Sequence, residues 1–150
     1  MRSKIVMSDA EAAAFLDEQF IVTCATLGHH GFPHLMPLWF VVRGGTLWAW
    51  TYRKSQKVVN LRRDPRTTLQ VEAGGTDYGQ LRGIMIEAQT RLHDDLDVVA
   101  GLGAALASRY GGVEVPPEAV AQQAPKRIAL EFAETRRVTW DHRKLGAGVY

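Results

Sequence analysis

The chain has 150 residues, of which 18 are basic and 16 acidic, so its formal net charge is +2. Hydrophobic residues make up 46% of the chain and charged residues 23%, which excludes a disordered tail and a collagen. The single cysteine excludes a disulfide scaffold. A chain of this length can bury about 68–70% of its unfolded surface, so we expect residues 1–150 to form one domain.

The first half of the chain predicts a helix and then mostly strands. Ser8 and Glu11 form a capping box in front of an apolar face, which predicts a short helix over 9–18. Segments rich in β-branched and aromatic residues, separated by glycine turns, are typical of strands. Pro37 removes a hydrogen-bond donor, so its strand is expected at a sheet edge or bulged. The strands are predicted at 20–27, 33–42 and 47–52, and a second helix at 55–63.

The second half predicts three more strands, with helices before the last of them. Alternating apolar residues predict strands over 67–73, 81–93 and 127–140, and helices are predicted after positions 94–95 and 116–117. Six strands joined largely by hairpins form an antiparallel sheet, which tends to close on itself to remove its edges. We therefore expect a small barrel with helices at its ends and side. In the last strand, residues of one parity are expected on one face, namely Ile128, Leu130, Phe132, Val138 and Trp140.

Several classes of site are not expected. The start of the chain shows no apolar signal region, and no apolar run approaches the roughly 18 residues of a membrane span, so we expect a cytoplasmic protein with no membrane partner. Cys24 lies in a strand-like segment and is expected to be a buried, inert thiol rather than a nucleophile. The sequence contains no HExxH, CxxC, GxSxG or Walker motif.

Three histidines surround the first predicted hairpin turn, at His29, His30 and His34. Neighbours on an extended segment point to opposite faces, and no cysteine or carboxylate lies near them. We therefore expect no metal site and interpret these histidines as solvated turn residues. The alternative is that one of them lines the mouth of a pocket.

The most informative segment runs from Thr51 to Lys57, where a strand end leads into a helix. Six basic residues fall between positions 53 and 66, against one acid. A helix N-terminus carries free N–H groups and a partial positive charge, and Ser55 adds a hydroxyl there. Lys57 in the first turn is unfavourable for the helix alone, but it becomes favourable when an anion such as phosphate lies between them. The alternative is a solvated basic face.

Two adjacent predicted strands are dense in aromatic residues. Five aromatics are more than the interior of a small barrel needs, although core packing remains the alternative. A phosphate site at the end of these strands would suit a planar, phosphorylated cofactor lying along them. The residues are Trp39, Phe40, Trp48, Trp50 and Tyr52.

The segments 37–40 (PLWF), 52–57 (YRKSQK) and 60–66 (NLRRDPR) together resemble the pyridoxamine 5′-phosphate oxidase-like split β-barrel family. The chain is most similar to the flavin/deazaflavin oxidoreductases of actinobacteria, whose B branch uses coenzyme F420. The resemblance runs from about residue 20 to 92, and 140–145 also has the family pattern. It implies a mainly β (α+β) fold, a six-stranded antiparallel split β-barrel with short helices, of the FMN-binding type.

The resemblance also implies a homodimer with cofactor sites at its interface. Lys57 matches the family's phosphate-binding lysine. Relatives that use FMN often carry an arginine directly before it, and because this chain has Gln56, the extra charge would come from Arg53 or Lys54. Gly83 stands where relatives carry a larger side chain. The implied cofactor-binding residues are Met36, Pro37, Leu38, Trp39, Thr51, Tyr52, Arg53, Lys54, Ser55 and Lys57.

The function implied is that of an F420-dependent oxidoreductase, an enzyme that passes hydride from the deazaflavin to an electron-poor small molecule. Catalytic residues stay unassigned, with His34 and Tyr78 as candidate proton donors. The alternatives are an FMN- or haem-binding member of the same fold, acting as an oxidase or haem-degrading enzyme, and a cofactor-binding protein without catalysis. RNA binding through the basic segment is disfavoured, because the aromatics are predicted in a hairpin and the arginines on a helix.

Overall fold

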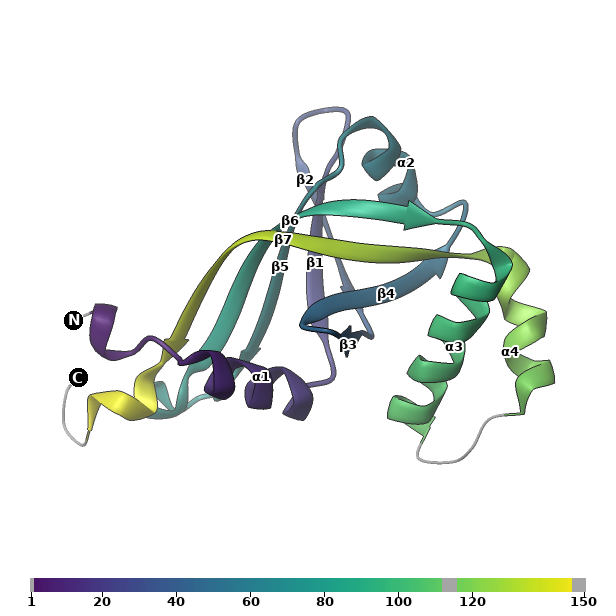
Figure 1. Cartoon of the computed structure of the whole chain (residues 1–150). Helices are drawn as coiled ribbons and strands as arrows, with labels where there is room; N and C mark the ends of the chain where they lie inside the picture. Colours follow the sequence, from purple (N-terminus) through teal and green to yellow (C-terminus); the bar gives the residue numbers. More distant parts are fainter. Residues whose placement is uncertain (1, 112–115, 147–150) are drawn as a thin grey trace.

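The computed structural model describes residues 2–111 and 116–146, which form one antiparallel sheet of seven strands (Figure 1). The strands are β1 (Val22–Leu27), β2 (Pro33–Leu38), β3 (Val41–Arg43), β4 (Thr46–Tyr52), β5 (Arg66–Ala73), β6 (Arg82–His93) and β7 (Arg127–Asp141). Their order across the sheet is β2-β1-β5-β6-β7-β4-β3. The two edge strands, β2 and β3, are consecutive in the chain and separated only by Trp39 and Phe40. The sheet must therefore curl until its edges approach, which produces a half-closed barrel.

Helices cover the ends and one side of this sheet. They are α1 (Asp9–Glu18), α2 (Gln56–Arg63), α3 (Leu96–Gly111) and α4 (Pro117–Gln123), with 3₁₀ turns η1 (Arg2–Lys4), η2 (Tyr78–Gln80), η3 (Ala124–Lys126) and η4 (His142–Leu145). In Figure 1, α2 lies beside β1 and β2, whereas α3 and α4 pack as a pair at the other end. Within the ranges described, no helix is both long and apolar enough to cross a membrane.

The sheet has one strand more than predicted, because the segment 33–42 divides at Trp39 and Phe40. The backbone N–H of Phe40 donates to the Tyr110 hydroxyl, at 2.8 Å, instead of to a neighbouring strand. Before this break the chain pairs with β1, and after it the chain pairs with β4. Pro37 lies on the edge strand β2, as its missing donor predicted.

The main core fills the inside of the curl, and α1 closes one end of it. The predicted capping box starts this helix: Glu11 N–H donates to Ser8 Oγ at 3.1 Å, and Ser8 N–H to Glu11 Oε1 at 3.0 Å. The helix then buries Ala12, Phe15 and Leu16 against the inward-facing strand residues. Those strand residues include Val22, Cys24, Leu47, Ala49, Leu69, Val71, Ile84, Ile86, Ile128, Leu130 and Phe132.

A β-bulge in β7 reverses the alternation of its side chains. The pairing with β6 skips Thr135, whose hydroxyl donates to the Glu87 carbonyl at 3.1 Å. Beyond the bulge, Val138 and Trp140 face away from the core. Because the extra residue shifts the alternation by one, the prediction of a single shared face is wrong for these two residues and holds for Ile128, Leu130 and Phe132.

A second core forms where α3 packs on the outer face of β4. Trp48 and Trp50 point to this face and pack against the helix, whereas Phe40 is buried in the main core. Gly103 allows the close approach, since a Cβ there would lie 2.4 Å from the Trp50 ring. Core packing, the alternative to a cofactor surface, therefore accounts for three of the five aromatics.

Candidate functional site

The segment from Thr51 to Lys57 lies where β4 ends and α2 begins (Figure 1). Ser55 is the N-cap of α2, but its hydroxyl makes no hydrogen bond to the first-turn amides. Its Oγ lies 3.5 Å from Thr51 Oγ1 instead. The first amides of a helix have no partner inside it. In α2 the Val58 amide already donates to the Ser55 carbonyl at 3.1 Å, so the amides of Gln56 and Lys57 are the ones left for an external acceptor.

Lys57 is a buried cation at this helix start. The residue is only 7% exposed, and its Nζ donates to Thr51 Oγ1 at 3.0 Å. Burial lowers the pKa of Lys57, an effect that the nearby Cys24 opposes. Within residues 2–111 and 116–146, no carboxylate forms an ion pair with Lys57. Because buried charges are stable when they are paired, this position favours an anion.

The Cys24 thiol, which interacts electrostatically with Lys57, is inert. Cys24 is 1% exposed, and burial raises its pKa to about 12, while the charge of Lys57 lowers it in part. The thiol therefore stays protonated at neutral pH and is a poor nucleophile. The prediction that Cys24 is buried is confirmed.

A buried chain of hydrogen bonds fixes the first turn of α2 to β1. Gln56 Nε2 donates to Asn60 Oδ1 at 2.9 Å, and Asn60 Nδ2 donates to Thr26 Oγ1 at 3.0 Å. Asn60 is fully buried, with both ends of its amide satisfied. These hydrogen bonds were not predicted from the sequence, although Gln56 and Asn60 are four positions apart and hence neighbours on a helix.

Strand β2 brings Met36 and Leu38 to the inner face of the sheet, but not Pro37. Met36 is the register partner of the buried Cys24, and Leu38 that of the buried Val22. Directly opposed residues in antiparallel strands share a face. Pro37, between them, therefore points to the other face.

Two of the aromatic residues in the implied cofactor set have partners of their own. Trp39 stacks on Tyr110, with ring centroids 4.4 Å apart and planes inclined by 10°. Tyr52 and Thr51 are neighbours on β4, so their side chains point to opposite faces of the sheet. The Arg127 guanidinium lies 3.7 Å from the centroid of the Tyr52 ring. Each keeps over half of its surface exposed, at 57% for Trp39 and 56% for Tyr52.

The two basic residues expected to supply extra charge lie at the surface. Arg53 is 3.6 Å from the Asp94 carboxylate, and this carboxylate is 70% exposed. An exposed pair of this kind contributes at most about 1 kcal/mol, so an anionic ligand can compete for Arg53. Lys54 is exposed. Gln56 adds no charge, and its amide is bound to Asn60.

A cavity of about 250 Å³ opens beside the first turn of α2 and contains all three turn histidines. The rings of His29 and His30 lie 3.8 Å apart. The expectation that they point to opposite faces is wrong, because both lie in a turn rather than in extended chain. His34 lies on β2. The full lining is Gly28, His29, His30, Phe32, Pro33, His34, Gln56 and Asn60.

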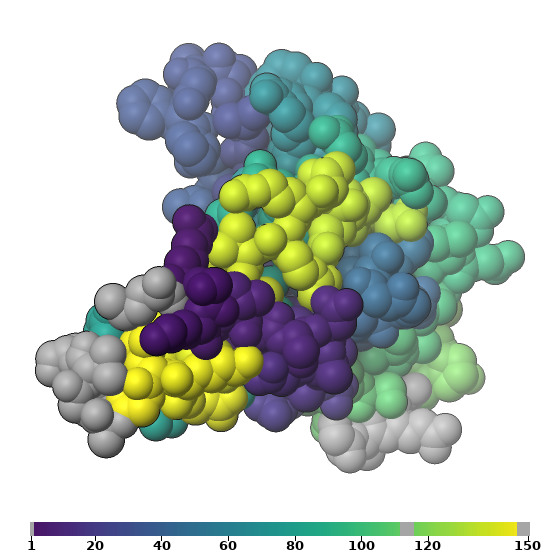
Figure 2. Space-filling model, turned by 60° about the vertical axis from the view of Figure 1, so that its left-hand side comes forward, coloured from purple at the N-terminus to yellow at the C-terminus, as the bar shows by residue number. Residues whose placement is uncertain are grey.

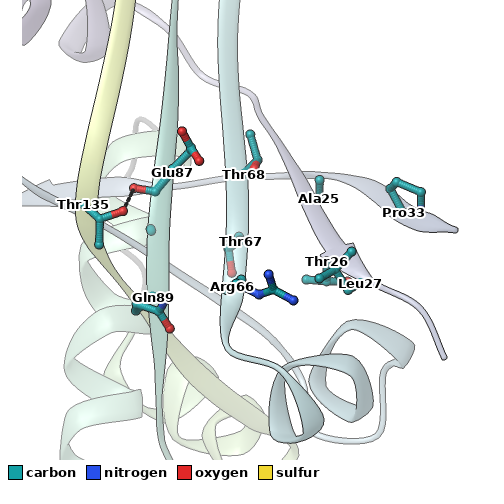
Figure 3. Close-up of a pocket in the computed structure, with 11 residues that line it drawn as sticks. Ala25, Thr26, Leu27, Pro33, Arg66, Thr67, Thr68, Glu87, Gln89 and Thr135 are labelled. Carbon is teal, nitrogen blue, oxygen red and sulfur yellow. Dashed lines mark hydrogen bonds between the residues drawn. The ribbon is translucent and has the colours of Figure 1, made fainter. Parts of the chain in front are cut away.

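A second cavity, of about 340 Å³, lies on the outer face of β1, β5 and β6 (Figure 3). Ala25, Thr68 and Glu87 are register partners there and point away from the core. Arg66 at its rim is bonded to Asp64, with 2.7 Å between Nη2 and Oδ2. Since its charged groups already have partners, this cavity attracts an anion less than the surroundings of Lys57.

Position 83 has no room for a side chain. A Cβ on Gly83 would lie 2.3 Å from the ring of Trp140, its register partner on β7. The ring of Trp140 therefore occupies the space that a side chain at position 83 would need, so Gly83 contributes no side-chain contact.

Comparison with known proteins places this geometry in a family. A family model described as pyridoxamine 5′-phosphate oxidase matches residues 8–140. A conserved hypothetical protein from Mycobacterium tuberculosis is 38% identical, with a TM-score of 0.92 over 100% of this chain and 94% of that chain. A comparison with curated proteins finds no match.

More distant structures share the fold. An F420 reductase is 20% identical, with a TM-score of 0.69 over 88% of this chain and 98% of that chain. A haem storage protein from Vibrio cholerae is 14% identical, with a TM-score of 0.68 over 87% and 94% of the two chains. With a family match over residues 8–140 and a curled antiparallel sheet, the chain belongs to the pyridoxamine 5′-phosphate oxidase-like family of split β-barrels.

Proposed function

We propose that this protein is a coenzyme F420-dependent oxidoreductase that reduces an electron-poor small molecule and works as a cytoplasmic homodimer. The observation that carries the proposal is Lys57, a buried ammonium without a carboxylate partner in the described ranges, located at a helix start. The helix end is itself partly positive. An anion offsets both the charge of Lys57 and the partial charge of the helix end, and the phosphate of a flavin-type cofactor is such an anion.

The chain supplies groups for each part of that cofactor. Lys57, the hydroxyls of Thr51 and Ser55 and the first amides of α2 would hold the phosphate, with Arg53 and Lys54 adding charge from the rim. The planar ring would lie along residues 36–39, as the family resemblance implies. When bound, the deazaflavin supplies hydride from its C5 carbon to an electron-poor C=C or C=N bond. The protein binds and orients the reactants and excludes water.

The structural neighbours support a cofactor of this kind without selecting one. One neighbour is an F420 reductase and another a haem storage protein. Gln56, at the position before Lys57, favours the deazaflavin over FMN, because FMN-using relatives often have an arginine there. FMN is the second candidate for the same site.

Exposed apolar side chains around β2 support the homodimer. Leu35 is 60% exposed, Met36 42% and Trp39 57%, and β2 is an edge strand with one side unpaired. Apolar surface on a sheet edge is usually covered by a partner. We expect light scattering to give twice the mass of the chain at micromolar concentration, and a monomer there would contradict the dimer.

The test of the cofactor is a fluorescence titration of the purified protein with F420 and, in parallel, with FMN. We expect micromolar or tighter binding of F420. Lys57→Met should weaken it about 10- to 150-fold, which corresponds to the 1.5–3 kcal/mol of a hydrogen bond to a charged group. Lys4→Ala removes an exposed lysine at the other end of the molecule and should leave binding unchanged.

Other outcomes of the titration redirect the function. Binding of FMN alone would move the protein to the flavin-using oxidases. A Soret band on addition of haem, with no flavin bound, would favour a haem protein. Tight F420 binding without reduction of any electron-poor acceptor would indicate a cofactor carrier.

A further inference from the structure

We propose that His34 is a ligand-contacting residue of this site, whose Nδ1–H donates a hydrogen bond to an anionic phosphate oxygen of the cofactor. This inference rests on the proposed function. From the sequence, His34 is interpreted as one of three solvated turn histidines, with lining of a pocket mouth and proton donation as the alternatives. Its position on β2 separates it from the other two.

The register of the sheet places His34 on the face occupied by α2. Its cross-strand partner is Thr26, which is buried and bonded to Asn60 of α2. His34 and Gln56, the first residue of α2, line the same cavity. The imidazole therefore opens onto the cavity beside the first residue of α2, and Lys57 follows that residue in the chain.

The Nδ1 atom of His34 is buried and has no hydrogen-bond partner in the described part of the chain. Leaving a buried polar atom unpaired costs about 1–3 kcal/mol, so such an atom usually marks a missing partner. The neighbouring polar groups, in contrast, have hydrogen-bond partners. Asn60 has both ends of its amide bonded, and Lys57 donates to Thr51.

The charges around the cavity indicate that the missing partner is an anion. Among the described residues that line it, none carries a carboxylate, and the titratable ones are His29, His30 and His34. The positive end of α2, at Gln56, borders the cavity. Both a neutral Nδ1–H tautomer and an imidazolium present a donor at Nδ1. A phosphate oxygen at this point would satisfy Nδ1 and offset the positive surroundings.

Two amide substitutions separate the ring nitrogens. Asparagine places its side-chain NH₂ near the position of Nδ1, whereas glutamine places it near Nε2. We therefore expect His34→Asn to keep most of the affinity, and His34→Gln and His34→Ala each to lose about tenfold, the equivalent of one charge-assisted hydrogen bond. Lys4→Ala, which alters an exposed residue outside this cavity, should leave affinity unchanged.

The experiment measures these variants with matched probes that differ in the phosphate. The pairs are FMN with riboflavin, which differ in the phosphate alone, and F420 with its deazariboflavin core, which lacks the phosphate and the tail attached to it. Loss confined to the phosphate-bearing probe, with recovery in His34→Asn, supports the proposal. Equal loss for both probes overturns it, because His34 would then act on the ring or on the cavity shape.

Two further outcomes separate this inference from the proposed function. Unchanged affinity in all His34 variants, alongside a loss in Lys57→Met, would overturn the role of His34 and leave the cofactor site standing. Binding of no probe by the wild-type protein would overturn both. Thermal unfolding of each variant, compared with wild type, excludes loss of the fold as the cause of weaker binding.

Discussion

Lys57 lowers the stability of the folded chain at neutral pH, because burial lowers its pKa below the ordinary 10.5. The unfolded chain then binds the proton more tightly, so stability rises with pH between the lowered value and the ordinary one. Lys57→Met keeps the side-chain length and removes the charge. We expect it to raise the free energy of unfolding at pH 7 by about 1–2 kcal/mol, as replacing buried charges often does.

Urea unfolding of both proteins at pH 7 and pH 10 checks this prediction. The advantage of Lys57→Met should shrink at pH 10, because the cost of releasing the Lys57 proton falls as the pH approaches the ordinary pKa of 10.5. Cys24, whose pKa is raised to about 12, is present in both proteins and largely cancels in the difference. An advantage that stays constant or grows with pH would contradict a desolvated lysine at this position.

Local sequence was enough to find Lys57 and Ser55, but not the groups around them. A basic residue two positions after an N-cap serine is visible in the chain itself. The hydrogen bonds that link Gln56, Asn60 and Thr26 depend on how α2 packs on β1, which no local pattern encodes. His34 lies on a strand and lines a cavity, as one of the predicted alternatives had it, but its position opposite Thr26 follows from the pairing of β1 with β2, which the segment itself does not encode.

Two glycines in the interior of helix α3 differ in the space around them. A Cβ on Gly101 would meet nothing within 4 Å, whereas a Cβ on Gly103 would lie 2.4 Å from the Trp50 ring. Both substitutions by alanine gain about 0.8–1 kcal/mol of helix propensity. We expect Gly101→Ala to stabilise the protein by up to that amount. Gly103→Ala should destabilise it, because overpacking costs about 1–3 kcal/mol.

Chemical denaturation of the two variants measures the difference, with each glycine serving as the control for the other. The double variant Gly103→Ala with Trp50→Phe should recover part of the loss, since the smaller ring leaves room for the methyl group. Equal stabilisation by both alanines would show that α3 does not pack closely on β4.

Most helices and strands were predictable because their patterns are local. The helix over 9–18 follows from its capping box, and β5 and β6 follow from alternation. The division between β2 and β3 depends instead on the Tyr110 hydroxyl, which bonds Phe40 from 70 positions away. The bulge at Thr135 likewise requires β6 as its partner, so neither feature has a signature in its own segment.

In the molecule as a whole, hydrogen bonds join the N-terminal and C-terminal segments of the chain. The N–H of Asp141 donates to the Ile5 carbonyl at 2.7 Å, and Lys144 Nζ donates to the Val6 carbonyl at 2.9 Å and the Glu11 carboxylate at 2.8 Å. Figure 2 shows the N-terminal segment in purple lying against the C-terminal segment in yellow. These contacts hold α1 over the end of the curled sheet, so we expect them to matter for global stability.

Asp141, whose N–H makes one of these contacts, is only 2% exposed. Its carboxylate accepts from Arg143 through the backbone N–H at 3.0 Å, Nε at 2.9 Å and Nη2 at 2.8 Å. These hydrogen bonds from Arg143 lower the pKa of Asp141. We expect Asp141→Asn to reduce the free energy of unfolding at pH 7 by about 1.5–3 kcal/mol, the range for hydrogen bonds to charged groups.

Lowering the pH should reduce the difference in unfolding free energy between wild type and Asp141→Asn. A carboxylate with a lowered folded pKa contributes its full stability above the ordinary value of 3.8 and loses it as pH falls through the lowered value. The gap between wild type and Asp141→Asn in urea unfolding should therefore be constant from pH 7 to 5 and narrow below pH 4. Asp17→Asn alters a carboxylate that is 87% exposed and should change stability by less than about 1 kcal/mol. A gap as wide at pH 3 as at pH 7 would mean that Asp141 stabilises the joined ends through packing rather than through its charge.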